Sequence, residues 1–248
     1  MTRPAVLLIA ATDSSGGAGL TRDVRVLTDF GVDALCAVTA VTAQSDQRVA
    51  AVHHVPPEVV QSQIAAALET RRLGAVKIGM LGDRATLEAV TDSLAHIAAV
   101  PIVVDPVLVS SSGGILLDTP GRTALLEKLL PRATLVTPNV PEVAALLGEP
   151  VAADEAGLIV QGQRLLTFGC QAILLKGGHA SGEAAVDWLI TPVSVQRITS
   201  SRVSGSSRGT GCALASGIAA GLASGLSLLE ACRRAKSYVL DAMLTPES

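Results

Sequence analysis

The chain reads Ser206-Ser207-Arg208-Gly209-Thr210-Gly211-Cys212 just before a long alanine-rich run, which predicts a glycine turn that opens a helix. Such a turn collects free backbone N–H groups at the positive end of the helix, where they can bind an anion. That position favours the thiolate form of a cysteine, so Cys212 could act as a base or nucleophile. The stretch suggests phosphoryl transfer; the alternative is a plain glycine turn beside a buried cysteine.

The composition around this turn favours a parallel sheet covered by helices. The 248 residues are 49% hydrophobic but only 2% aromatic, so the core must be built from alanine, valine and leucine. No linker, repeat or low-complexity tract is found, and we expect a single domain over residues 1–248. The net charge of −3, without a basic cluster, argues against nucleic acid as the main partner.

The cysteines and the uncharged stretches bear on location. Four widely spaced cysteines form no CxxC pair and no metal-binding pattern, so free thiols in a reducing cytoplasm are expected. No secretion signal precedes the first apolar segment. Residues 209–229 carry no charge and repeat glycine at intervals of four, as some membrane helices do. Their few large apolar side chains favour a buried helix instead, and we expect no membrane contact.

Short apolar runs alternate with amphipathic runs along the chain. Strands are expected at residues 5–11, 36–43, 75–80, 101–105, 135–137 and 172–176. Helices are expected at about 17–30, 57–70, 83–98, 120–130, 141–147, 154–168, 211–224 and 227–243. Residues 188–195 are typical of a hairpin at the margin of a sheet. The alternation predicts right-handed βαβ units and therefore an α/β fold with a mainly parallel sheet covered on both faces.

Every predicted strand ends in polar or glycine-rich residues. In chain order these ends are Thr12 to Gly19, Gln44, Gly79-Met80, Asp105-Pro106, residues 138–142, and Lys176-Gly177-Gly178-His179. In an open α/β sheet, ligands gather beyond the carboxyl ends of the strands. Six such ends in succession predict a binding site at that edge.

Two common nucleotide sites do not fit the sequence. If Gly17 and Gly19 open a dinucleotide-binding turn, Arg22 occupies the place of its third glycine, and the second strand ends at Gln44 rather than at an acid. A phosphate-binding loop with the Gly-Lys-Ser/Thr pattern does not occur. Nicotinamide, flavin and P-loop sites are therefore not expected.

Three residues are candidates for a magnesium shell. Asn139 and Glu142 flank a strand-to-helix junction, where a carboxylate can hold magnesium directly or through water. The alternative is structural, with Asn139 capping the helix and Glu142 favouring its first turn. Asp105 ends an otherwise apolar strand, which is a poor structural choice and a better candidate for metal binding.

Lys176 is a candidate for contact with a transferring phosphate. It ends an apolar strand and is followed by two glycines, so its ammonium group could neutralise phosphate oxygens. The alternative is a lysine that merely extends into solvent from a strand end. The four histidines lack metal-ligand spacing and are interpreted as structural or surface residues.

Taken together, these segments resemble the ribokinase-like superfamily, and most of all its hydroxymethylpyrimidine/phosphomethylpyrimidine kinases of thiamine biosynthesis. The resemblance runs from Ala5 to about Met243. Its motifs are Asp13-Ser14-Ser15-Gly16-Gly17-Ala18-Gly19, Thr42-Ala43-Gln44, Lys77-Ile78-Gly79-Met80-Leu81, Asp105-Pro106-Val107, Thr137-Pro138-Asn139 with Glu142, Lys176-Gly177-Gly178-His179 and Gly209-Thr210-Gly211-Cys212. Any one of these is weak, but their order is specific.

The resemblance implies an α/β/α sandwich that uses ATP and Mg²⁺ for two phosphorylations at one site, and it suggests a homodimer. Substrate-binding residues would be Gln44 at the aminopyrimidine edge, Asp23 near the hydroxymethyl group or ring, Met80 and Val107 as apolar walls, and Ala11. Phosphate-binding residues would be Lys176 and, in the anion hole, Gly209, Thr210 and Gly211, with Arg208 beside them. Cys212 would take the place of the base, and Asp105, Glu142 and Asn139 would belong to the metal shell.

Three positions depart from the family pattern. Arg208 stands where the family often has histidine, so it could bind phosphate or alter substrate choice. Ala11 replaces a glycine and places a methyl group near the pocket, and relatives usually continue beyond the position of Ser248. Two alternatives stay open. The first is a kinase for pyridoxal or another vitamin precursor, although such kinases commonly have aspartate at the position of Cys212. The second is a non-catalytic pyrimidine-binding or regulatory protein.

Overall fold

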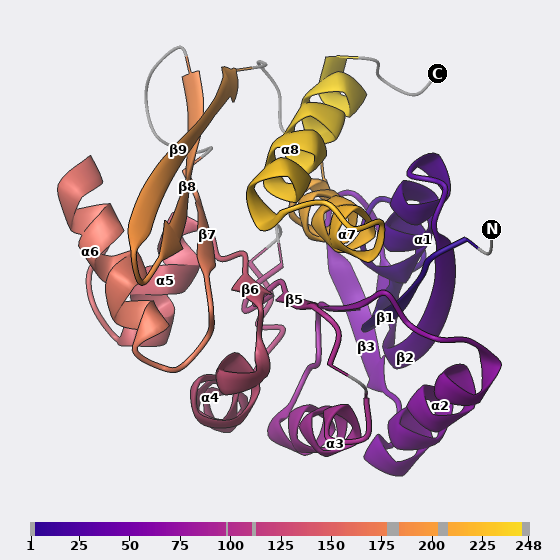
Figure 1. Ribbon diagram of the computed structural model, residues 1–248. Helices are drawn as coiled ribbons and strands as arrows, with labels where there is room; N and C mark the ends of the chain where they lie inside the picture. The colour runs from indigo at the N-terminus through magenta and orange to yellow at the C-terminus, as the bar shows by residue number, and fades with distance from the viewer. Residues whose placement is uncertain (1–2, 98, 111–112, 178–183, 203–207, 245–248) are drawn as a thin grey trace.

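The computed structural model describes residues 3–97, 99–110, 113–177, 184–202 and 208–244 (Figure 1). Nine strands form one sheet in the order β3-β2-β1-β4-β5-β6-β7-β8-β9. Their bounds are β1 Ala5–Asp13, β2 Asp33–Gln44, β3 Val49–His54, β4 Ala75–Ile78, β5 Ile102–Val104, β6 Leu135–Val136, β7 Ile173–Lys176, β8 Ala184–Thr191 and β9 Ser194–Ser201. The six strands from β2 to β7 in this order run parallel, as predicted.

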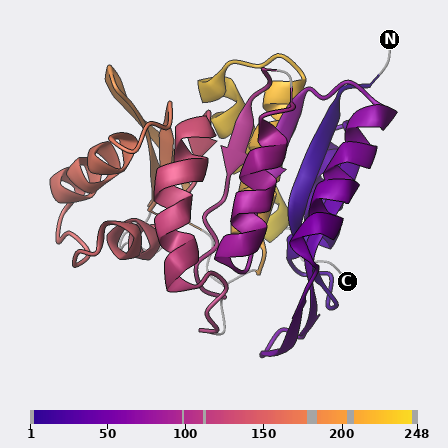
Figure 2. The same ribbon diagram turned by 90° about the horizontal axis from the view of Figure 1, so that it is seen from below.

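Helices cover both faces of this sheet. Their bounds are α1 Gly19–Asp29, α2 Pro57–Thr70, α3 Arg84–Leu94, α4 Thr119–Ala124, α5 Val140–Leu147, α6 Glu155–Leu166, α7 Thr210–Ala223 and α8 Leu228–Leu244. In Figure 2, helices of one face stand side by side in front of the sheet, while α7 and α8, in orange and yellow, lie behind it. The helix expected at 120–130 is shorter, because the chain widens into a π-helical turn over Leu125–Leu129 and then a 3₁₀ turn over Leu130–Arg132.

Alternation along β1 explains why the fold has three layers. Leu7 and Ile9 belong to an apolar core shared with helices α2 to α6, whereas Val6 and Leu8 belong to a second core shared with α1, α7 and α8. All four side chains are buried, and each such burial contributes about 1.5–3 kcal/mol. A strand buried on both faces must be apolar throughout, which is the pattern that the sequence shows. The α/β sandwich is thus confirmed.

The margins of the sheet are antiparallel. β8 and β9 form the hairpin that the sequence predicted. β3 was not predicted; it pairs antiparallel with β2 at the opposite edge, with Ala40 opposite His54. Most of its side chains are exposed, so no alternation of buried positions marks it as a strand.

The uncharged stretch that resembled a membrane span forms α7 and the connection to α8. Nine of the 14 residues of α7 are buried. A Cβ atom at Gly217 or Gly221 would lie 3.0 Å from the Cβ of Ala235 or Ala231 in α8, so these glycines permit close helix packing. No helix in the described part of the chain has the length and apolarity needed to cross a membrane.

Candidate active site

The predicted glycine turn stands at the start of α7. Gly209 has a φ of +74°, a conformation that favours glycine, and a side chain there would collide with the carbonyl oxygen of Gly17. The helix begins without a side-chain cap and without an acidic residue in its first turn. Its first N–H groups, on Thr210 and Gly211, therefore carry the positive field that an anion requires. The glycine turn and the start of the helix lie where the sequence predicted them, and binding of an anion there stays a prediction.

Gly211 lies directly over two residues from distant strand ends. A Cβ atom at this position would be 3.2 Å from Nζ of Lys176 and 3.6 Å from Oδ2 of Asp105. Lys176 ends β7 and Asp105 follows β5, and the Lys176 Nζ donates to Asp105 Oδ1 over 3.0 Å. The absence of a side chain at Gly211 thus lets this turn approach a half-buried lysine and a buried carboxylate.

Cys212 follows the turn, but its acidity differs from the prediction. Burial of the sulfur raises the pKa of Cys212 to about 11, although the ammonium group of Lys77 and a hydrogen bond from the Gly19 N–H act in the opposite direction. The carboxylates of Asp23 and Asp105 raise it further. The sequence argument counted the helix field and omitted desolvation, which favours the neutral thiol. The position of Cys212 at the turn is as predicted, while the depressed pKa is not.

Asn139 and Glu142 form a capping box at the start of α5. Asn139 Oδ1 accepts the Glu142 N–H over 2.8 Å, and Glu142 Oε2 accepts the Asn139 N–H over 2.7 Å. Asn139 therefore caps the helix, which was the structural alternative to metal binding, and its side-chain oxygen accepts the capping hydrogen bond. Burial raises the pKa of Glu142 to about 7; Lys176 lowers it and Asp105 raises it, which places Glu142 within the electrostatic reach of both.

Asp105 and Glu142 fit a magnesium ion. Mg²⁺ commonly takes only one or two protein carboxylates and completes its shell with water and substrate phosphates. Asp105 is buried, and the mutual repulsion of the two carboxylates would be relieved by a cation between them. Among the described residues, no group of three or more histidine, cysteine or acidic side chains could hold a metal alone. A magnesium site here would therefore need the phosphates as further ligands.

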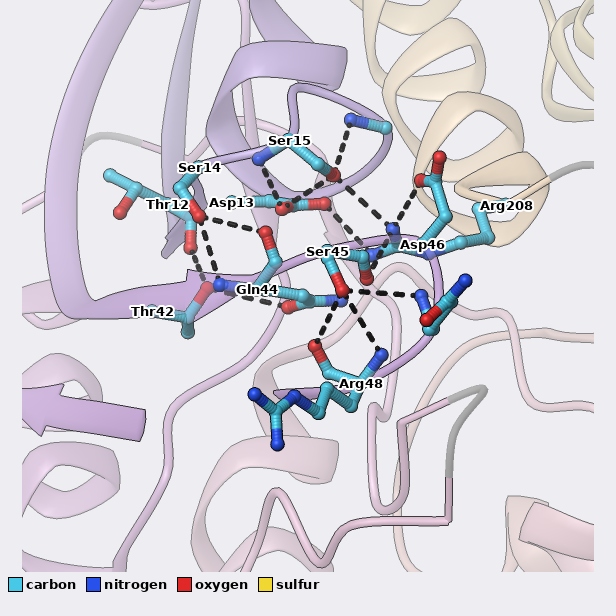
Figure 3. Close-up of polar contacts among 12 residues, drawn as sticks. Thr12, Asp13, Ser14, Ser15, Thr42, Gln44, Ser45, Asp46, Arg48 and Arg208 are labelled. Atoms are coloured by element: carbon cyan, nitrogen blue, oxygen red, sulfur yellow. Dashed lines mark hydrogen bonds and ion pairs between the residues drawn. The ribbon is translucent and has the colours of Figure 1, made fainter. Parts of the chain in front are cut away.

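Gln44 ends β2 beside the loop that follows β1. The Ser14 hydroxyl donates to the Gln44 carbonyl and accepts the Gln44 N–H, both over 2.8 Å (Figure 3). The Gln44 Oε1 accepts a longer hydrogen bond from the Thr42 hydroxyl, 3.3 Å. The backbone of Gln44 is thus fixed on both sides, while its side chain stays partly exposed.

The residues predicted to form the apolar walls of the pyrimidine site pack against one another. Ala11 and Met80 form a small buried cluster with Ala40, and Val107 packs against it. The Thr39 hydroxyl donates to the Met80 carbonyl over 2.6 Å and fixes the backbone there. The methyl group of Ala11 is buried in this cluster, so it contributes to an apolar wall.

The sequence profile described as phosphomethylpyrimidine kinase matches residues 13–247. The chain belongs to this family. A curated hydroxymethylpyrimidine/phosphomethylpyrimidine kinase of Rhizobium meliloti (strain 1021) is 41% identical over 238 residues, which cover 96% of this chain and 89% of that protein. The enzyme of the same name from Escherichia coli (strain K12) is 36% identical, and the match covers 98% of this chain and 92% of that protein.

Solved structures agree with this assignment. Phosphomethylpyrimidine kinase from Clostridium difficile 630 has a TM-score of 0.86 and 32% identity, and the match covers 97% of this chain and 100% of that one. A pyridoxal kinase from Staphylococcus aureus in complex with AMP-PCP and pyridoxal has a TM-score of 0.91 at 27% identity, over 100% and 90% of the two chains. Both known activities are phosphoryl transfer to a small ring compound, according to their names.

Asp23 is the predicted site residue whose environment differs most from what the family resemblance implied. Its side chain is fully buried, and its two oxygens accept from Lys77 Nζ over 2.6 Å and from the Ser216 hydroxyl over 2.7 Å. Both oxygens of its carboxylate are thus used by protein partners, while Asp23 still lies within electrostatic reach of Cys212 and Asp105, so its contact with a substrate stays a prediction. α1 turns Asp23 inward because a buried lysine on β4 requires a counter-charge.

Lys77 was missed as a functional candidate. Burial lowers its pKa, but Asp23, Cys212 and Asp105 together raise it above the usual lysine range, so the ammonium form is retained. The signal was present in the sequence, because a lysine inside the apolar run of β4 must have a partner if it is buried. Lys77 supplies a fixed positive charge within electrostatic reach of the Cys212 sulfur.

Arg208 lies beside the anion turn, but its guanidinium group extends away from it. The group contacts Asp13 at the end of β1 and Ser15 in the loop that follows (Figure 3). It also contacts Ser45 and Asp46 after β2. The other sequence-predicted residues gather at the carboxyl ends of the strands. His179 and the two serines at 206 and 207 lie outside the described residues.

A groove of about 460 Å³ lies between β9 and α8, near the end of β9 that leads to the turn. Arg197, Arg233 and Lys236 line it together with hydroxyl side chains. Lys236 Nζ donates to the buried Asp187 over 2.6 Å, and Asp187 also accepts the Gly177 N–H over 3.1 Å. The groove wall is thus connected to the residue that follows Lys176.

Proposed function

We propose that this chain is an ATP-dependent kinase that phosphorylates hydroxymethylpyrimidine and then its monophosphate, as part of thiamine biosynthesis. The observation that carries the proposal is the convergence of Gly211, Lys176 and Asp105 in a chain that matches phosphomethylpyrimidine kinases over nearly its whole length. Phosphoryl transfer needs chiefly positioning and charge neutralisation, and these residues supply both.

The proposed roles follow from charge and position. The N–H groups of residues 209–211 bind the transferring phosphate, and Lys176 neutralises its oxygens. Asp105 and Glu142 would hold Mg²⁺, which would supply further positive charge to bound phosphates. The cationic groove between β9 and α8 receives the rest of the nucleotide.

The pyrimidine lies between Gln44 and the apolar cluster. The side-chain amide of Gln44 offers both a donor and an acceptor, which complement an aminopyrimidine edge. Met80, Val107 and Ala11 pack against the ring. Cys212 accepts the proton from the hydroxymethyl group, and the Lys77 ammonium group stabilises the thiolate that this role requires.

ADP release tests the proposal. Purified protein with ATP and Mg²⁺ should release ADP with hydroxymethylpyrimidine and with its monophosphate. No turnover with either pyrimidine rejects the function. Binding of hydroxymethylpyrimidine without ADP release at saturating ATP supports the non-catalytic binding protein instead.

Pyridoxal phosphorylation is the second candidate, because the fold superimposes on pyridoxal kinase with a TM-score of 0.91. The thiol at Cys212 and the identity of 41% to a pyrimidine kinase favour the first candidate. Competition between pyridoxal and hydroxymethylpyrimidine separates them. A higher kcat/KM for pyridoxal than for hydroxymethylpyrimidine would make pyridoxal phosphorylation the first candidate.

We also infer a cytoplasmic homodimer. All four cysteines are free, which suits a reducing compartment. The exposed β3 edge offers a surface on which a second copy could pair. Light scattering after size-exclusion chromatography should give twice the 25.2 kDa chain mass, and a monomer mass refutes the dimer.

A further inference from the structure

Arg208 connects the anion turn to two other loops. Its Nη1 donates to the Ser45 carbonyl and to Asp46 Oδ1, each over 2.8 Å, and contacts the Ser15 hydroxyl over 3.2 Å. Its Nη2 donates to Asp13 Oδ2 over 3.0 Å. Figure 3 shows the guanidinium group surrounded by these acceptors. Both terminal nitrogens are therefore committed to protein atoms.

The strongest of these contacts is the pair with Asp13. The carboxylate of Asp13 is 2% exposed, and its other oxygen accepts the N–H and the hydroxyl of Ser15, each over 2.9 Å. Burial of a carboxylate is costly unless a nearby positive charge and hydrogen bonds compensate for the lost water. Arg208 supplies that charge from 195 residues further along the chain. Asp46, in contrast, is 83% exposed, so its ion pair with Arg208 is screened by water.

The contact with the Ser45 carbonyl reaches the residue next to Gln44. The turn containing Ser45 is closed by a hydrogen bond from the Ser45 N–H to the Arg48 carbonyl, 3.0 Å. Gln44 itself is held by Ser14 through both backbone groups. One side chain thus joins the Gln44 turn, the loop after β1, and Gly209 at the start of α7.

We propose that Arg208 is a positioning residue that couples the pyrimidine-binding turn to the anion hole, rather than a phosphate ligand. The inference rests on the proposed function for the role of Gln44. Two carboxylates flank the guanidinium group and would repel a phosphate placed against it. A planar fork holds several acceptors in fixed directions, so movement of one loop changes the position of the other.

This coupling predicts positive cooperativity between the two ligands. If the pyrimidine orders the Gln44 turn, Arg208 transmits that order to the N–H groups at residues 209–211. A nucleotide then binds a turn that is already ordered, and linkage requires the reverse effect to be equal. A mutual increase in affinity of about tenfold is typical of such coupling.

Isothermal titration calorimetry tests the coupling with the full chain. The dissociation constant of AMP-PCP is measured with and without saturating hydroxymethylpyrimidine for the unsubstituted protein, Arg208→Met, Arg208→Lys and the control Asp46→Ala. Arg208→Met should abolish the roughly tenfold coupling while changing the affinity for AMP-PCP alone by less than threefold. Arg208→Lys should also lose it, because lysine keeps the charge and loses the fork. Asp46→Ala should retain it.

A phosphate-binding role gives the opposite pattern and overturns the proposal. Arg208→Met would then weaken AMP-PCP binding by tenfold or more without pyrimidine, and Arg208→Lys would restore much of it. A second measurement does not depend on the substrate. Amide hydrogen exchange at Ser45 should increase in ligand-free Arg208→Met and remain normal in Asp46→Ala.

The two measurements separate the inference from the proposed function. If the unsubstituted protein binds no hydroxymethylpyrimidine but exchange at Ser45 increases in Arg208→Met, the positioning role stands and the function fails. Unchanged exchange refutes the positioning role whatever the substrate. Should Arg208→Met not fold, Arg208→Lys gives the same two readouts.

Discussion

The Cys212 thiol combines a half-buried position with a nearby positive charge. Burial raises its pKa to about 11, so the ligand-free protein carries the neutral thiol at neutral pH. The Lys77 ammonium group partly opposes this effect. Such a group can accept a proton only while it is in its small thiolate fraction, or after ligands change its surroundings and favour the thiolate. The sulfur is therefore better regarded as a conditional base than as a preformed one.

Replacement of this sulfur tests the role. Cys212→Ser should reduce kcat by about 100-fold, because a hydroxyl is far less acidic than a thiol and general base catalysis typically contributes that much or more. The thermal unfolding midpoint should change little, since the two side chains have similar size. Unchanged kinetics would remove Cys212 from the base role. Alanine at the exposed Cys36 provides the control.

The raised pKa of Cys212 predicts the pH dependence of its alkylation. Only the thiolate reacts, so below a pKa of about 11 the rate should rise roughly tenfold per pH unit. Mass spectrometry of the labelled peptide, in ligand-free protein treated with iodoacetamide between pH 7 and 9, measures this slope. A rate that levels off near pH 7 would mean a depressed pKa and contradict the structure. The Cys212→Ser variant shows how much labelling of this peptide does not come from Cys212.

At the scale of elements, α1, β4 and α7 meet through one buried ion pair. Lys77 on β4 donates to Asp23 on α1, and Ser216 on α7 donates to the same carboxylate. The pair holds the helix that begins at the anion turn in a fixed place against the sheet. Removing one partner would leave the other as an uncompensated buried charge.

Lys77→Met should therefore destabilise the fold by about 3–5 kcal/mol. The double variant Asp23→Asn/Lys77→Met removes both charges and should be more stable than Lys77→Met alone. Urea unfolding followed by circular dichroism measures both. If the double variant is no more stable than the single one, the unpaired charge is not the cause. Arg84→Met, at an exposed ion pair, should cost less than about 1 kcal/mol.

The predictability of the elements depended on their burial. β1 and β4 were predicted because strands buried on both faces are apolar in sequence. β3 was not, because it is an exposed edge strand whose existence depends on pairing with β2. Gln44 was found in the sequence because it ends a predicted strand. Gly211 was found because it lies in a glycine turn that opens a predicted helix. The inward orientation of Asp23 and the desolvation of Cys212 are tertiary effects that no local pattern contains.

At the scale of the whole molecule, the proposed ligand sites join segments that are distant in sequence. The loop after β1, the Gln44 turn and the start of α7 meet through Arg208 and through the close approach of Gly209 to Gly17. Ligands that bind these segments in the folded state alone must stabilise the fold as a whole. The resemblance of the sequence motifs to the family predicted that these segments form one site. The contacts of the Arg208 side chain became known only from the structure.

Thermal unfolding in the presence of ligands tests the assembly. At 100 times its dissociation constant a ligand adds about 2.7 kcal/mol, which for a chain of this length raises Tm by about 5 °C or more. Hydroxymethylpyrimidine and AMP-PCP should each give such a shift. Gln44→Ala should lose most of the pyrimidine shift and keep the AMP-PCP shift, because the proposed function gives this amide a contact with the pyrimidine and none with the nucleotide. Gln47→Ala, on the exposed side of the same turn, should keep both. Equal loss of the two shifts in Gln44→Ala would contradict pyrimidine recognition by Gln44, since a residue that supports the whole site affects both ligands alike.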